Sequence, residues 1–85
     1  MKIKDVKLRA DATKQDLNNM KHAAYMAALC DPLEAKYHYA VANIERLLSN
    51  DQAALHHYTR AVELNPTGGE YLQRLGLILS ELNPD

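Results

Sequence analysis

Aspartate or asparagine followed by proline occurs three times in this chain, and the pair constrains the fold more than any other feature. The pairs are Asp31-Pro32, Asn65-Pro66 and Asn83-Pro84. Proline ends a helix because it lacks the amide hydrogen and its ring clashes with the preceding turn. No further proline occurs, and the chain has only three glycines. The pattern predicts an all-α chain of about four helices.

Residues suited to begin a helix follow or include these pairs. In a capping box, the first side chain accepts a hydrogen bond from a backbone amide, and an acid or amide three residues on reaches back. Proline also suits the first helical position. We therefore expect helices to begin near residues 31, 49 and 67, with short turns that make neighbouring helices antiparallel. The three candidate boxes are Asp31 with Glu34, Ser49 with Gln52, and Thr67 with Glu70.

The first and last helical segments differ in composition. Residues 13–30 are rich in alanine, which lets a neighbouring helix approach closely. Residues 1–12 are predicted to be either a basic tail or an extension of the same helix, ahead of a single domain at 13–85. In the last segment Leu77 lies off the main apolar stripe, so this helix is apolar on nearly all sides. An uncovered helix of this kind predicts self-association or a protein partner.

Charge and composition exclude several classes of function. The net charge of −1 argues against general binding of nucleic acid. A single cysteine forms no disulfide within the chain and fits a reducing compartment, so a cytoplasmic location is expected. No run of about eighteen apolar residues occurs, so no membrane insertion is expected. Apolar residues make up 47% of the chain, which is enough for a packed core.

A shift of 34 residues aligns the chain with itself. It places Asp31-Pro32 on Asn65-Pro66, and Ala27 on Ala61. A helix–turn–helix unit of about 34 residues is the period of the tetratricopeptide repeat.

The residues on this period resemble the tetratricopeptide family. Small residues around one aromatic, closed by proline, look like its second-helix signature, and a Leu-Gly pair looks like the first-helix signature of a following repeat. The resemblance implies antiparallel helical hairpins stacked as a short array, with a whole repeat at about 35–68 and partial repeats on either side. His38 and Glu45 stand where the family favours aromatic residues, and a generic four-helix bundle is the alternative. The repeat-packing residues are Ala54, Tyr58, Ala61, Pro66, Leu75 and Gly76.

The resemblance also implies a concave groove, lined by the first helices of successive repeats, that holds a peptide or helix of a partner. Two cations, an amide and a phenol on this face suit an acidic peptide or a C-terminal carboxylate. Only fragments are present of the set with which some family members grip a carboxylate, and Glu70 opposes it, so a solvated helix face is the alternative. The predicted partner-binding residues are Lys36, Tyr39, Asn43, Arg46, Gln73 and Leu77.

Metal-binding side chains are sparse. His22, Met26 and Cys30 recur at four-residue steps and are soft ligands, but Met26 and Cys30 are expected to fill the core. His56 and His57 point about 100° apart on a helix, so we expect one at the surface and one partly packed.

Catalytic arrangements are missing from the sequence. Gly68-Gly69 is not followed by the Lys-Ser or Lys-Thr pair of a phosphate-binding loop. We expect no enzyme activity and no cofactor. The predicted function is a small adaptor, scaffold or chaperone-like subunit that binds another protein. The alternative is a structural unit that forms a homo-oligomer through its exposed terminal helices.

Overall fold

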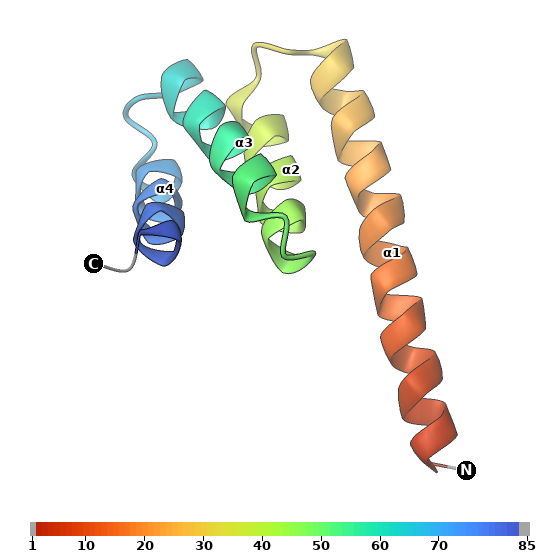
Figure 1. Ribbon diagram of the computed structural model, residues 1–85. Helices are drawn as coiled ribbons and strands as arrows, with labels where there is room; N and C mark the ends of the chain where they lie inside the picture. Colours follow the sequence, from red (N-terminus) through yellow and green to blue (C-terminus); the bar gives the residue numbers. More distant parts are fainter. Residues whose placement is uncertain (1, 84–85) are drawn as a thin grey trace.

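The computed structural model describes the backbone of residues 2–83 and the side chains of residues 13–83. Over these residues the chain forms four α-helices and no strand, which confirms the prediction of an all-α fold. Consecutive helices run in opposite directions (Figure 1). The helices are α1 (Lys2–Cys30), α2 (Ala35–Leu47), α3 (Asp51–Leu64) and α4 (Gly69–Leu82).

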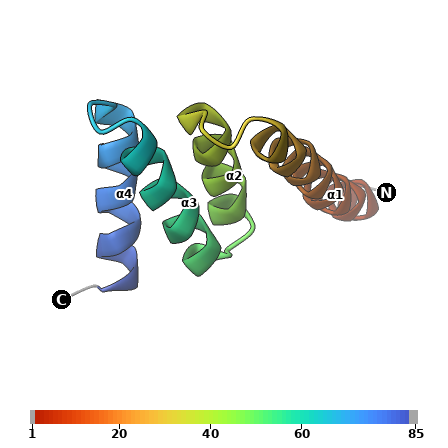
Figure 2. The same ribbon diagram turned by 90° about the horizontal axis from the view of Figure 1, so that it is seen from above.

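Each helix packs mainly on the helix that follows it in the chain, α1 on α2, α2 on α3 and α3 on α4. Seen from above, the helices follow one another in chain order, so α1 and α4 lie at opposite edges (Figure 2). The molecule measures 49 × 38 × 18 Å. A row this thin buries little surface, and the outer faces of α1 and α4 carry no neighbouring helix within the described part of the chain.

The core lies where α2, α3 and α4 meet. Ala42 of α2, Ala54 and Tyr58 of α3, and Ile78 of α4 form one fully buried cluster. The two alanines have no side chain beyond Cβ, so the backbones of α2 and α3 approach closely and leave room for the tyrosine ring. Ala61, one turn after Tyr58, is also fully buried.

The turn between α1 and α2 is a β-turn. The amide of Glu34 donates to the carbonyl of Asp31 at 3.2 Å. Pro32 takes the second position of this turn, for which its fixed φ is well suited. Helix α2 then begins at Ala35, and no side chain caps it. The prediction that Asp31 caps this helix is therefore wrong, because proline fits this turn as well as it fits a first helical position.

The same turn recurs between α3 and α4. The amide of Gly68 donates to the carbonyl of Asn65 at 3.1 Å, with Pro66 again in second position. Thr67 donates to the side chain of Asn65 rather than capping α4, so its predicted cap is wrong as well. A Cβ at Gly68 would lie 2.7 Å from the ring of Tyr71, so this position requires glycine unless the ring moves.

Helix α2 ends in a Schellman motif. Ser49 has a positive φ of 66°, and its amide donates to the carbonyl of Arg46 at 3.0 Å. The amide of Asn50 donates to the carbonyl of Glu45 at 2.8 Å. These two bonds satisfy carbonyls that the helix end would leave without partners. Ser49 therefore ends α2, and the prediction that it caps α3 is wrong.

Helix α1 is about twice as long as the others, with 29 residues against 13 in α2. Its N-terminal half projects past the ends of α2 and α3 (Figure 1). The side chains of residues 1–12, predicted as a basic tail or helix extension, lie outside the described residues. Of the described side chains of α1, only Ala28 is buried. Met26 and Cys30 are exposed, so the prediction that they fill the core is wrong.

Candidate functional site

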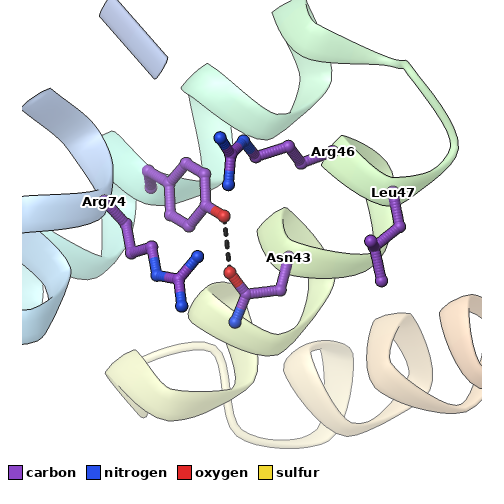
Figure 3. A pocket seen from close by; sticks show the side chains of 5 residues that line it. Asn43, Arg46, Leu47 and Arg74 are labelled. Carbon is purple, nitrogen blue, oxygen red and sulfur yellow. Dashed lines mark hydrogen bonds between the residues drawn. The ribbon is translucent and has the colours of Figure 1, made fainter. Parts of the chain in front are cut away.

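Three helices converge on a polar hollow of about 210 Å³ (Figure 3). Helix α2 contributes three of the lining side chains, and α3 and α4 contribute one each. The lining residues are Asn43, Arg46, Leu47, Tyr58 and Arg74.

The hydroxyl of Tyr58 connects this hollow to the core. Its ring is fully buried, while the hydroxyl donates a hydrogen bond to Oδ1 of Asn43. Burial raises the pKa of Tyr58, although the charges of Arg46 and Arg74 oppose the rise. The hydroxyl therefore stays protonated near neutral pH. Oδ1 of Asn43 accepts this bond, so the NH₂ group of the same side chain is left to donate to a ligand.

The two guanidinium groups of the polar hollow differ in their partners. Arg46 donates to both carboxylate oxygens of Glu81 on α4, from Nη2 at 2.6 Å and from Nε at 3.3 Å. This pair raises the pKa of Arg46 and lowers that of Glu81. Arg74 makes no hydrogen bond or ion pair with any residue of the described chain. It is the guanidinium available to a ligand.

The predicted partner-binding face of α2 is partly occupied by α4. The Tyr39 hydroxyl donates to the Glu70 carboxylate at 2.8 Å, and the rings of Tyr39 and Tyr71 lie 4.7 Å apart. Lys36 is exposed, with Nζ 5.6 Å from the ring centroid of Tyr37. Of the predicted residues, only Asn43 and Arg46 line the polar hollow.

Two predicted residues of α4 lie outside the polar hollow, and a third residue takes their place. Gln73 and Leu77 are exposed and do not line it. Arg74, which does, was missed because the 34-residue shift matches it to Ala40, which has no charge. Its spacing was informative, since Arg74 precedes the buried Ile78 by four residues and so lies on the same face of α4.

Three leucines of α4 are uncovered among residues 13–83, next to the exposed Gln73 and Ser80. Leu72, Leu77 and Leu79 are between 42% and 47% exposed. Gly76 lies among them, with open space where a side chain would extend. Leu75, by contrast, is half-buried against the core.

A second polar group, the buried polar cluster, joins α1 to α2 and α3. It consists of Lys21 and Tyr25 of α1, His38 and Glu45 of α2, and His57 of α3. Glu45 is only 4% exposed. It accepts hydrogen bonds from Tyr25 at 2.8 Å and from Asn50 at 2.8 Å, and its carboxylate lies 3.5 Å from the ammonium of Lys21.

The pKa values in this cluster follow from these contacts. Burial would raise the pKa of Glu45, but the hydrogen bonds from Asn50 and Tyr25 and the charge of Lys21 lower it. Burial, the hydrogen bond to Glu45 and its charge together raise the pKa of Tyr25 to about 12. Near neutral pH, therefore, Glu45 is ionised and Tyr25 keeps its proton.

The sequence contained one signal for this cluster. His38 and Glu45 are polar at positions where the resemblance called for aromatic residues. The expectation that one member of the His56-His57 pair is at the surface and the other partly packed is confirmed, since His56 is exposed and His57 half-buried.

No three or more His, Cys, Asp or Glu side chains among the described residues are placed to hold a metal ion. Within residues 2–83, no helix combines the length and the hydropathy needed to cross a membrane.

Comparisons of the chain with protein-family models, with curated proteins and with solved structures found no match.

Proposed function

We propose that this chain is a tetratricopeptide-like protein-interaction module whose polar hollow binds an acidic segment of a partner protein. It would act as a small adaptor, scaffold or chaperone-like subunit. The observation that carries the proposal is the unpaired guanidinium of Arg74, which lies in a hollow beside the Asn43 amide.

Two features of the fold support the repeat on which this proposal rests. The β-turns at Asp31-Pro32 and Asn65-Pro66 have the same hydrogen bond and stand 34 residues apart. Ala54, Tyr58 and Ala61, which carry the likeness to the family's second helix, are fully buried.

The chemistry of the polar hollow favours a carboxylate. A guanidinium binds a carboxylate through two parallel hydrogen bonds, and the Asn43 amide supplies a further donor. Glu81 already binds Arg46 in this way, so a carboxylate of the chain itself illustrates the contact. A volume of about 210 Å³ lies below the range of about 300–1,000 Å³ typical of small-molecule sites. It suits one acidic side chain or chain terminus.

Binding of dye-labelled peptides, measured by fluorescence anisotropy, tests this proposal. Peptides rich in Asp and Glu are expected to bind more tightly than matched peptides with Asn and Gln. Arg74→Gln is expected to weaken binding of the acidic peptides about tenfold or more, because a charge-assisted contact contributes about 1.5–3 kcal/mol.

Arg60→Gln is the matched control, since Arg60 is an arginine of α3 that pairs with its neighbour Glu63 and does not line the polar hollow. Equal binding of acidic and neutral peptides, or equal losses in the two variants, would contradict an acidic ligand at Arg74.

Self-association is the second candidate function, and the uncovered leucines of α4 favour it. Leu72→Asp is expected to convert an oligomer to a monomer in sedimentation experiments. Leu29→Asp on α1, at a leucine that is 71% exposed, is the control and should leave the oligomer intact. A wild-type chain that remains monomeric at millimolar concentration would remove this candidate.

A further inference from the structure

The buried polar cluster fixes the tautomer of His57. Nε2 of His57 lies 3.1 Å from the hydroxyl oxygen of Tyr25. That hydroxyl already donates its only hydrogen to Glu45. The oxygen must therefore accept, and His57 carries its hydrogen on Nε2. Its Nδ1 is left with a lone pair, and this atom is buried without a hydrogen-bond partner in the described chain.

His38 has the same tautomer, with its hydrogen on Nε2. Its Nε2 lies 2.9 Å from the carbonyl oxygen of Pro32. A carbonyl only accepts, so His38 also carries its hydrogen on Nε2. Its Nδ1 is again buried and lacks a partner among residues 13–83. The rings of His38 and His57 are stacked, with centroids 5.8 Å apart and an angle of 21° between their planes.

Protonation of His57 at Nδ1 is unfavourable while α1 is docked. The new N–H group would be buried with no acceptor, and a buried unsatisfied donor destabilises the folded state. The imidazole of His38, stacked on it, and that of His56, with its ring centroid 5.2 Å away, also oppose a positive charge on His57. The Glu45 carboxylate attracts the charge, but Tyr25, Asn50 and Lys21 already occupy it.

These groups face His57 from every helix packed around it. They are Lys21 and Tyr25 from α1, His38 and Glu45 from α2, and His56 from α3. The balance of burial and charge lowers the pKa of His57, with burial the largest cause, followed by His56 and His38.

Helix α1 is joined to α2 and α3 through this cluster. Ala28 is its only buried residue among those whose side chains are described. Tyr25 and Lys21 join it to Glu45 and His57 through two hydrogen bonds and a salt bridge. We propose that α1 is an acid-released arm, docked on α2 and α3 while His57 is neutral and undocked when that imidazole takes up a proton.

Release of α1 would change the surface that the molecule offers. Val41 is fully buried and lies four residues before Glu45, on the face of α2 that α1 covers. Undocking therefore uncovers an apolar strip on α2. This face is separate from the polar hollow, which α2, α3 and α4 form without α1.

Hydrogen exchange of the full chain, read by mass spectrometry at about pH 7.5 and about pH 5.5, tests the proposal, because this range spans histidine titration. The quantity compared is the protection of the α1 amides at residues 21–30, relative to that of the α3 amides in the same sample. This relative protection is expected to fall in acid on the order of tenfold, the change that uptake of one proton produces over one pH unit. Unchanged relative protection would overturn the proposal.

Two variants identify the group responsible. His57→Gln keeps an N–H donor for Tyr25 but does not titrate, so its α1 protection should match the wild type at about pH 7.5 and no longer fall in acid. His22→Gln, at an exposed histidine of α1 outside the buried polar cluster, should keep the wild-type fall. The same residual fall in both variants would also overturn the proposal.

A measurement on the wild type keeps the proposal testable even if α1 fails to dock in the His57→Gln variant. In an NMR titration, the ¹⁵N shifts should report the Nε2–H tautomer of His57 at neutral pH. The α1 amide shifts should then change with the same midpoint as the His57 imidazole. A different midpoint, or an Nδ1–H tautomer, would contradict the mechanism.

Discussion

The two end helices of this row are held by different physical interactions. Helix α4 inserts Ile78, fully buried, into a cluster with Ala42, Ala54 and Tyr58. Helix α1 inserts only Ala28 among its described residues and is held by hydrogen bonds and a salt bridge to a buried carboxylate. The α4 edge is therefore centred on a fully buried apolar side chain, whereas the α1 edge adds a polar network around a buried carboxylate to its apolar contacts.

This difference determines how the stability of each edge responds to pH. Burial of apolar surface is not directional and does not depend on protonation. A buried polar network stabilises only while every member has its partner and its correct charge. The α4 edge should therefore tolerate changes in pH that loosen the α1 edge.

The largest expected effect is at the apolar edge. Ile78→Ala should destabilise the fold by about 2–4 kcal/mol, because it removes buried methyl groups and leaves a cavity. Urea unfolding followed by circular dichroism measures this loss. Leu79→Ala, at a residue 42% exposed, should change stability by less than about 0.5 kcal/mol. Similar losses in both variants would show that α4 is not anchored through Ile78.

A smaller effect is expected at the polar edge. Glu45→Ala should cost about 1–3 kcal/mol, because it removes a buried carboxylate with its hydrogen bonds and leaves the half-buried hydroxyl of Tyr25 without its acceptor. Hydrogen exchange should show the loss of protection in α1 and little in α4. Glu63→Ala, at the exposed acid of α3, is the control. A uniform loss over all helices would mean that the two edges are not independent.

Alkaline pH should also weaken the polar edge. Tyr25 has a pKa raised to about 12 from an ordinary value of 10.0. The unfolded chain therefore loses this proton first as pH rises, so the contribution of Tyr25 to stability is full below pH 10 and is lost towards pH 12. Tyr25→Phe should reduce stability at neutral pH and flatten this alkaline fall, as measured by thermal unfolding across the range. An equally steep fall in the variant would assign it to other groups.

The smallest effect is expected for the exposed ion pair between Arg46 and Glu81. It links α2 to α4 at the surface, where solvent and salt screen the charges. Glu81→Gln should lower the melting temperature slightly at low salt, and the difference from the wild type should vanish in molar sodium chloride. A large loss that salt does not diminish would mean that α4 is held by this pair as well as by its apolar face.

Much of the architecture was predictable because the signals are local. The Asn-Pro and Asp-Pro pairs locate the ends of helices, since proline acts within one turn of its own position. The spacing of Ala54, Tyr58 and Ala61 places them on one face of α3, and all three are buried. The helix starts were predicted less well. Asp31 and Thr67 lie in β-turns, and Ser49 ends α2, because the same residue types serve turns and caps alike.

The functional surfaces depended on residues far apart in the chain. Asn43 and Arg46 were identified from the face they share on α2, but Arg74 joins them only because α4 packs beside α3. In the buried polar cluster, Glu45 pairs with Tyr25 across 20 residues and Tyr25 pairs with His57 across 32. No helical period connects these positions.

The sequence by itself determined that this chain is helical, where its helices end, and which face of α3 is buried, because periodicity and proline act over one or two turns. Only the tertiary structure decided which arginine is left unpaired and that a buried carboxylate of α2 links α1 to the other helices. Hydrogen bonds and burial depend on distances between helices, and those distances are set when the row of helices packs together.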